Sequence, residues 1–328
     1  MVTARNTLPN ASGPPIEKRA VLVKSEPDII IEENCPRDGL QNESNSFSLL
    51  DRVALIEALA DCGLKRIQIG SFVNPARVPQ MAGTEEVFGL LKPRAGVIYS
   101  ALVLNRRGLE RAEDCGIRHV SVFVSASETH SLRNSNCSVD EAMAGARDLI
   151  ERAKEGGFTV QAGVMNAFGC RFEGVISSER VLQMVRAFSD HGADEINLAD
   201  TSGLANPVQV QALILATRSV TKLPLALHLH DTFGFGIANA HAAWNLGVRR
   251  FDASCGGLGG CPFIPGAAGN IATEDLAWFF DSMGVCTGVD LNRMLEIVME
   301  LERKLGRRLP GRLAHAGFNG APLRCHSG

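Results

Sequence analysis

The chain has 328 residues, a length that suits one large barrel or two ordinary domains. Its formal net charge of −3 does not favour nucleic acid or an anionic membrane surface as a partner. No apolar run approaches the ~20 residues that a transmembrane helix needs. Nine cysteines are scattered without a CxxC pair, which is typical of reduced intracellular thiols and not of a disulfide framework.

Residues 1–24 are polar and include Gly13-Pro14-Pro15, so we expect them to form a disordered leader. The leader has no apolar core, which argues against a secretory signal. We therefore expect a cytoplasmic protein. The mitochondrial matrix is the alternative if the leader is a transit peptide, because acidic residues are absent before Glu17.

Strand-like and helix-like segments alternate from Ile29 onward. The helical segments carry apolar residues at a spacing of three and four, and several begin at capping residues such as Ser48. The predicted strands are Ile29–Glu33, Arg66–Gly70, Val97–Val103, His119–Val124, Phe158–Val164, Glu195–Ala199, Leu225–Asp231 and Arg250–Ser254. The predicted helices are Ser48–Gly63, Thr84–Leu91, Gly108–Cys115, Val139–Glu155, Ser178–His191, Pro207–Val220, Ile237–Leu246 and Ala272–Met283.

Eight strand–helix units in about 250 residues predict an α/β fold, a (β/α)8 TIM barrel. A doubly wound open sheet is the competing architecture, but no glycine-rich dinucleotide fingerprint follows the first strand. We expect the barrel to occupy residues 25–288. The C-terminal region, 289–328, is predicted to contain one more amphipathic helix over 290–306 and a tail, Arg307–Gly328, that frays.

Two histidines share one face of the predicted strand Leu225–Asp231. Because side chains alternate along a strand, the three leucines point to one side, while His228 and His230 point to the other. Imidazoles spaced in this way converge on one point, which suits a divalent metal. The alternative is that they are two unrelated histidines near the end of a strand.

The active site of a barrel lies at the C-terminal ends of its strands. Asp38 follows the first strand and Asn270 follows the last, so with the two histidines they offer one carboxylate, two imidazoles and one amide oxygen. This set without a thiolate favours Mg²⁺ or Mn²⁺ over Zn²⁺. A metal and Arg37 together can stabilise two separated oxyanions, as carbon–carbon cleavage or formation beside a carbonyl requires. The alternative for Arg37 and Asp38 is a surface ion pair.

Cys261 lies in the glycine-rich run Gly256–Pro262 after the last strand. Flanking glycines make a mobile loop that can close over a site, and a cysteine there can donate a proton to a carbanion. The alternative is a thiol that only packs, as we expect of the other eight cysteines.

Five segments of the chain resemble motifs of the 3-hydroxy-3-methylglutaryl-CoA lyase family. They are Asn34–Glu43, Ser71–Met81, Ser127–Ser138, His228–Asn239 and Gly257–Asp275. The resemblance extends over about residues 28–290 and implies a metal-dependent lyase built on a TIM barrel.

The resemblance also implies roles for individual residues. Arg37 is expected to stabilise the enolate of the departing acyl-CoA, and Cys261 is expected to act as an acid or base on a flexible loop. Asp38 and His228 are expected to serve catalysis as well as metal binding. The implied metal ligands are Asp38, His228, His230 and Asn270.

The implied reaction is the retro-Claisen cleavage of a 3-hydroxy-3-substituted glutaryl-CoA. Its products are acetyl-CoA and a keto acid, which is acetoacetate for the 3-methyl parent substrate. The family resemblance further implies a homodimer. The expected substrate contacts are Arg37, Gln68, Asn134, Asp200 and Thr201.

Gln68 departs from the family pattern, which has a glutamate at this position. Ile67 and Ile69 share one face of the strand, so Gln68 is predicted to point into the barrel beside Arg37. An amide has no charge and adds two hydrogen-bond donors. We therefore expect donation to an extra acceptor on the substrate, a shifted acyl preference and poor cleavage of the parent substrate. The alternative is that Gln68 is a neutral replacement.

Two other functions stay open. The first is a condensing synthase of the isopropylmalate or citramalate type, or a pyruvate aldolase. Such relatives usually have an asparagine after the second histidine, where this chain has Asp231, and they lack the loop around Cys261. The second is a catalytically silent metal-binding barrel, which only Gln68 favours and which the retained Arg37 argues against.

Overall fold

The structure is a computed structural model that describes residues 26–43, 47–259 and 269–317. Within these residues, eight parallel strands form a closed barrel in which each strand pairs with its neighbours in the sequence and the last pairs with the first. The strands are β1 (Ile30–Glu33), β2 (Arg66–Ser71), β3 (Ile98–Leu102), β4 (His119–Ser125), β5 (Thr159–Met165), β6 (Glu195–Asp200), β7 (Leu225–Leu229) and β8 (Arg250–Ala253).

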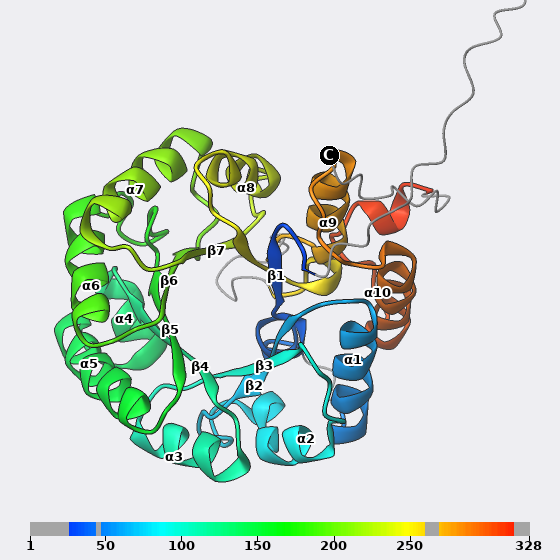
Figure 1. The fold of residues 1–328 in the computed structure, drawn as a ribbon, viewed down its shortest axis with the longest axis horizontal. Coiled ribbons are helices and arrows are strands. Elements are labelled where there is room, and N and C mark those ends of the chain that lie inside the picture. The colour runs from blue at the N-terminus through cyan, green and yellow to red at the C-terminus, as the bar shows by residue number, and fades with distance from the viewer. Residues whose placement is uncertain (1–25, 44–46, 260–268, 318–328) are drawn as a thin grey trace, which may run out of the picture.

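Helices surround the strands as an outer ring, so the predicted TIM barrel is confirmed (Figure 1). The last two helices lie between α8 and α1 and complete this ring (Figure 1). The helices of the described residues are α1 (Leu49–Asp61), α2 (Thr84–Leu90), α3 (Arg106–Cys115), α4 (Glu128–Ser135), α5 (Val139–Glu155), α6 (Ser178–Asp190), α7 (Pro207–Val220), α8 (Gly236–Asn245), α9 (Thr273–Ser282) and α10 (Leu291–Leu305).

Helix α4 is the one element of this ring that we did not predict, because its segment reads as a polar loop. The Ser127 hydroxyl caps its first turn by accepting the His130 N–H at 3.1 Å. Asn136, with a φ of 57°, ends the helix in the left-handed conformation. Local capping therefore makes a helix of a segment that has no apolar stripe.

Charged side chains gather inside the barrel near the N-terminal ends of the strands. Arg66 lies between two carboxylates, 2.8 Å from Glu32 and 3.0 Å from Glu195. Arg250 also pairs with Glu195, and His119 Nε2 lies 3.0 Å from an Arg66 nitrogen. We call these five residues the floor cluster.

The segment after α10 corrects one expectation. The predicted fraying is wrong for residues 307–317, because Leu309 and Leu313 are buried. Leu309 packs so closely on Gly256 that a Cβ there would lie 2.4 Å from a leucine methyl carbon. The N–H of Gly311 donates to the Gly256 carbonyl at 3.0 Å. We call Leu309–Leu313 the C-terminal strap.

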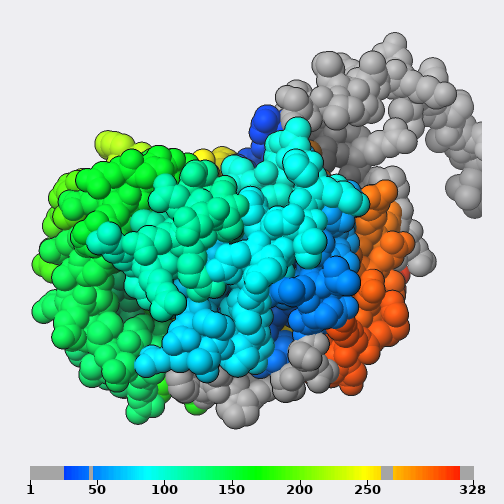
Figure 2. Space-filling model, turned by 90° about the horizontal axis from the view of Figure 1, so that it is seen from below, coloured from blue at the N-terminus to red at the C-terminus, as the bar shows by residue number. Residues whose placement is uncertain are grey.

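The outer helices form a continuous surface on the side of the molecule shown in Figure 2. There the orange C-terminal helices lie beside the blue α1, and Lys304 of α10 is 2.5 Å from Asp51 of α1. Among the residues that the structure describes, no helix combines the length and apolar character of a membrane span. The predicted leader, 1–24, lies outside the described residues.

Candidate metal centre and active site

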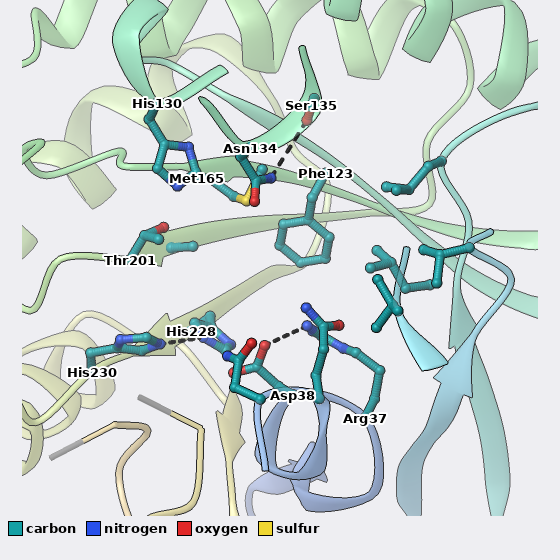
Figure 3. Close-up of a pocket in the computed structure, with 17 residues that line it drawn as sticks. Arg37, Asp38, Phe123, His130, Asn134, Ser135, Met165, Thr201, His228 and His230 are labelled. Carbon is teal, nitrogen blue, oxygen red and sulfur yellow. Dashed lines mark hydrogen bonds and ion pairs between the residues drawn. The ribbon is translucent and has the colours of Figure 1, made fainter. Parts of the chain in front are cut away.

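A π-helical turn, Cys35–Gly39, follows β1 and carries Arg37 and Asp38. The carbonyl oxygen of Asn34 accepts the N–H groups of Arg37 at 3.1 Å, of Asp38 at 2.8 Å and of Gly39 at 3.1 Å. Turns of this kind are rare and occur frequently at functional sites. The turn points both charged side chains toward the C-terminal end of the barrel (Figure 3).

Glu33, at the end of β1, connects this turn to the segments that follow the neighbouring strand β8. Its carboxylate accepts the N–H groups of Cys35 and Cys255 at 2.8 and 2.9 Å, and the Thr273 hydroxyl at 2.7 Å. Burial raises the pKa of Glu33 to about 7, although these three hydrogen bonds act in the opposite direction. One buried carboxyl group therefore joins the π-helical turn, the segment after β8 and the start of α9.

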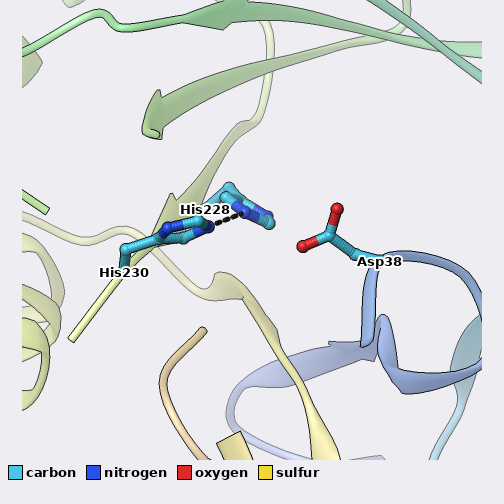
Figure 4. Close-up of side chains that lie close together, drawn as sticks. All are labelled: Asp38, His228 and His230. Atoms are coloured by element: carbon cyan, nitrogen blue, oxygen red, sulfur yellow. Dashed lines mark hydrogen bonds between the residues drawn. The ribbon is translucent and has the colours of Figure 1, made fainter. Parts of the chain in front are cut away.

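Asp38, His228 and His230 converge at the C-terminal end of the barrel (Figure 4). One potential ligand atom of each lies within 4.8 Å of the others. The Nε2 atoms of the two histidines face each other at 3.1 Å, so at least one of them is an acceptor. Such a convergence of lone pairs is the arrangement that a divalent cation stabilises. We call these three residues the metal cluster.

The protonation states of the metal cluster suit a cation. Burial opposes ionisation of Asp38, but the Arg37 guanidinium at 2.5 Å and the two imidazoles bring its pKa down to about 2. Burial, together with the neighbouring His228, lowers the pKa of His230 to about 3. At neutral pH the cluster thus contains a carboxylate and a neutral His230, which are the forms that bind metal.

Asp252 and Asn197 orient the His228 imidazole from the side that faces away from the metal cluster. His228 Nδ1 lies 3.1 Å from Asp252 Oδ2, and the Asn197 amide donates to the same oxygen at 3.0 Å. A carboxylate at Nδ1 holds the proton there and leaves Nε2 free for a metal. We did not predict either residue. The sequence signal for Asp252 is a charged residue within the predicted strand β8. Its role follows from the strand register, which pairs Asp252 with His228.

Asn270 lies beside the metal cluster because its backbone forms an isolated antiparallel β-bridge with that of His230. Its amide nitrogen donates to Asp38 Oδ2 at 2.8 Å and to the Leu258 carbonyl at 2.9 Å. Its oxygen is buried without a hydrogen-bond partner in the described part of the chain. A half-turn of the amide would direct this oxygen toward Asp38, which is favourable only with a cation between them. The donor set therefore fits a divalent ion.

A cavity of about 280 Å³ opens beside the metal cluster. Arg37 and the cluster line one side, and Phe123, Met165 and Asn134 lie across from them (Figure 3). Thr201 also lines the cavity, so the structure places both Asn134 and Thr201 in its wall, and their contact with a substrate stays a prediction. The apolar part of the wall consists of Val73, Val78, Leu102, Leu104, Phe123, Met165 and Ala199.

Gln68 lies against Arg37, as the sequence predicts. Its amide oxygen accepts a hydrogen bond from Arg37 Nε, and the side chain is 1% exposed. The amide nitrogen donates to the Ser121 hydroxyl at 3.1 Å. The expectation that this nitrogen serves a substrate acceptor is therefore not supported, because it points to Ser121 inside the barrel.

The Asp200 side chain is not among the residues that line this cavity. The Asp200 carboxylate accepts the N–H groups of Leu204 and Ala205 at 2.9 and 3.0 Å, which orders the connection between β6 and α7. Burial raises the pKa of Asp200 to about 6. Cys261 lies outside the described residues, so its role stays a prediction.

Comparison with known proteins agrees with this geometry. The family model described as HMGL-like matches residues 28–300. A hydroxymethylglutaryl-CoA lyase of Pseudomonas mevalonii is 45% identical over 272 residues, which are 83% of this chain and 90% of the relative. An (R)-citramalyl-CoA lyase of Chloroflexus aurantiacus is 42% identical over 300 residues, which are 88% of this chain and 95% of the relative.

A solved structure gives the same result in three dimensions. An HMG-CoA lyase from Acinetobacter baumannii, in complex with coenzyme A and 3-methylmalate, matches with a TM-score of 0.84 at 39% identity. The match covers 89% of this chain and 96% of that chain. The prediction of a carbon–carbon lyase that acts on CoA substrates is confirmed at the level of the family. The chain belongs to the HMGL-like family.

Proposed function

We propose that this chain cleaves the C2–C3 bond of 3-hydroxy-3-methylglutaryl-CoA or of a related 3-hydroxy-3-substituted acyl-CoA. The products are acetyl-CoA and a keto acid. The observation that carries the proposal is the convergence of the metal cluster beside Arg37 at the edge of a cavity. This arrangement places positive charge at two points, as the separation of two oxyanions requires.

We infer that the cation is Mg²⁺ or Mn²⁺ and that Asp38, His228, His230 and Asn270 hold it. Carboxylate and amide oxygens with two imidazoles, and no thiolate, form a donor set that these ions accept. When bound, such a cation supplies charge that favours ionisation of a substrate hydroxyl. The buried, unpartnered oxygen of Asn270 in the described structure supports its inclusion.

The reaction needs a base, an oxyanion partner and an acid. The base takes the proton of the C3 hydroxyl, the C3 oxygen becomes a carbonyl oxygen, and the electrons of the C2–C3 bond pass to C2 as an enolate of the thioester. Arg37, which lines the cavity and is held by Asp38 at 2.5 Å, stabilises this enolate. Cys261 then returns a proton to C2, which gives the methyl group of acetyl-CoA.

Two substrates follow from the relatives. Hydroxymethylglutaryl-CoA and citramalyl-CoA both carry a C3 hydroxyl and a C3 methyl group, and they differ by one methylene before the free carboxylate. A difference of this size is worth about 1–3 kcal/mol in an apolar pocket. Because Gln68 leaves Arg37 without the negative partner of the family pattern, we keep the expectation of a shifted acyl preference and poor cleavage of the hydroxymethylglutaryl substrate.

The deciding experiment measures acetyl-CoA release by metal-stripped protein after addition of Mg²⁺ or Mn²⁺. The panel contains both named thioesters and homologues with longer C3 alkyl groups, and Asp38→Ala is the control. Cleavage of at least one thioester that depends on metal and on Asp38 supports the proposal. Condensation of acetyl-CoA with a 2-oxo acid, without cleavage of any thioester, would support the synthase alternative. If the protein neither cleaves nor condenses these compounds, the catalytically silent barrel is supported.

The family resemblance also leads us to propose a homodimer. Light scattering on the purified protein measures the mass in solution and compares it with one chain of 328 residues. A mass near that of a single chain at assay concentrations would contradict the dimer without affecting the proposed reaction.

A further inference from the structure

A series of buried hydrogen bonds runs from Arg37 to the floor cluster through the inside of the barrel. Arg37 donates to Gln68, and Gln68 donates to the Ser121 hydroxyl at 3.1 Å. Ser121 donates to Gln161 Oε1 at 3.1 Å, and Gln161 Nε2 donates to Glu195 at 2.6 Å. The three intermediate residues are at most 1% exposed. Water therefore does not compete for these hydrogen bonds.

The lower end of this series has a fixed direction. Burial opposes ionisation of Glu195, but Arg66 and Arg250 lower its pKa below the usual value. An ionised carboxylate only accepts hydrogen bonds. Gln161 must therefore turn its amide nitrogen toward Glu195, and Glu32 Oε2 at 3.4 Å from the same nitrogen favours the same orientation. The oxygen of Gln161 is thereby left facing Ser121.

The same reasoning fixes the upper end. The hydroxyl of Ser121 has one proton, which it donates to Gln161, so it offers a lone pair to Gln68. Gln68 then turns its nitrogen to Ser121 and its oxygen to Arg37. The reverse orientation would bring the amide N–H groups against the Arg37 Nε–H, and two facing donors inside the barrel are unfavourable.

We propose that Ser121 and Gln161 are positioning residues for catalysis. They transmit the orientation of Glu195 to Gln68, whose oxygen holds the Arg37 guanidinium against the cavity. The proposal rests on the proposed function, in which Arg37 stabilises the enolate. It explains how an uncharged side chain accepts from Arg37 Nε, while the Asp38 carboxylate pairs with Nη1 of the same guanidinium.

The proposal also predicts that a glutamate does not fit at position 68 in this chain. A carboxylate there would present acceptors to Arg37 and to Ser121. The single proton of Ser121 would then have two acceptors, Gln161 and the new carboxylate, and one of them would be buried without a donor. Gln68→Glu alone is therefore expected to lower activity instead of raising it.

The main test compares two buried serines. Ser121→Ala breaks the series, whereas Ser100→Ala removes a hydroxyl that donates to Glu32 at 2.6 Å outside the series. Ser100 is 0% exposed, as is Ser121, and lies opposite Gln68 in the pairing of β2 with β3. We expect Ser121→Ala to lower kcat about tenfold or more with KM within about twofold, because small displacements of a catalytic group are costly. Ser100→Ala is expected to leave both constants within about twofold.

Two further variants separate positioning from packing. Ser121→Thr keeps the hydroxyl and is expected to restore kcat to within about twofold of the wild type. Gln68→Met removes the link to Arg37, so Ser121→Ala added to it should cause no further loss of kcat. Fully additive losses, or equal losses for Ser121→Ala and Ser100→Ala, would overturn the proposal.

A measurement without substrate keeps this test independent of the reaction. In protein labelled with [¹⁵N]arginine, the Nε–H signal of Arg37, assigned with Arg37→Lys, is expected to exchange slowly with water because Gln68 accepts it inside the barrel. Exchange should become fast in Ser121→Ala and stay slow in Ser100→Ala. Equal exchange in the two variants overturns the positioning role. Absence of cleavage by the wild type would instead overturn the proposed function alone.

Discussion

The two ends of the barrel interior differ in how their polar side chains are paired. In the floor cluster, unlike charges alternate, so that Arg66 lies between Glu32 and Glu195. At the other end, ligand atoms of the metal cluster face one another. There the Asn270 Oδ1 atom, a candidate ligand, is buried without a hydrogen-bond partner in the described residues. Within the same part of the chain, the floor also has one buried atom without a partner, Arg66 Nε, but its guanidinium has carboxylates on both sides. At the C-terminal end, the facing ligand atoms have no positive charge between them.

This contrast separates the residues that stabilise the fold from the residues that bind a ligand. Paired charges inside a barrel cost solvation but leave no group that needs a ligand. Buried atoms without partners cost free energy of folding, and a fold tolerates them where a ligand later satisfies them. Breaking the floor should therefore change stability, in addition to its effect on turnover through Gln161 and Ser121. Breaking the other end should change metal content and turnover without a large change in stability.

The largest expected effect is on stability, at the floor. Glu195→Ala leaves Arg66 and Arg250 without their shared carboxylate, and removal of one partner from a buried ion pair costs about 3–5 kcal/mol. Urea unfolding measures this loss. Glu110→Ala breaks an exposed ion pair with Arg106 and should cost less than about 1 kcal/mol. Equal midpoints for the two variants would show that the floor does not stabilise the fold.

The next effect is on function, at the metal cluster. Asp38→Ala and His228→Ala should lose bound metal and lower kcat by about 10²–10³-fold, since electrostatic groups of this kind are worth about 3–4 kcal/mol. Elemental analysis and acetyl-CoA release measure both quantities. The matched control is His241→Ala, on α8, which should keep both. Full activity after exhaustive chelation would rule out the metal, and a large loss of stability in Asp38→Ala would contradict the contrast between the two ends.

A smaller effect on metal affinity is expected at Asp252, which contacts the candidate ligand His228. Asp252→Asn keeps the size of the side chain but removes the carboxylate that lies 3.1 Å from His228 Nδ1. Loss of such a partner typically costs 10–100-fold in metal affinity or activity. Titration of metal into stripped protein gives the dissociation constant. An unchanged dissociation constant would mean that metal binding by His228 does not depend on the Asp252 carboxylate.

The last prediction concerns pH and Glu274, beside the C-terminal strap. Burial raises the pKa of Glu274 to about 8, so the folded state binds its proton more tightly than the unfolded chain. Stability from this group is full below the ordinary carboxyl pKa of 4.5 and is lost as pH rises toward about 8. Glu274→Gln should therefore flatten the decrease of the melting temperature between pH 5 and pH 8. Parallel curves for variant and wild type would contradict the raised pKa.

Much of the fold could be predicted because one simple pattern repeats. Apolar residues at helical spacing alternate with short apolar strands, and the barrel closes from these units without any exceptional contact. Helix α4 escaped prediction because it depends on the Ser127 cap and on Asn136, and not on an apolar face. The C-terminal strap could not be predicted because Leu309 packs on Gly256, which is far away in the sequence.

The candidate site divides in the same way. Residues whose chemistry is unusual at a strand end, such as Asp38 and His228, could be identified from the sequence. The position of Gln68 beside Arg37 also followed from strand alternation. Asp252 and Ser121 could not be found, because their roles depend on strand register and on which neighbour takes a proton. Those are properties of contacts and not of residue types.

The C-terminal strap is made after all eight strands in the order of synthesis. Leu309 covers Gly256 in the turn after β8, and the Gly311 N–H donates to the carbonyl of the same glycine. The segment of the described chain that is synthesised last therefore covers a turn that follows the last strand of the barrel. A chain that stops before Leu309 is expected to leave this turn exposed to water.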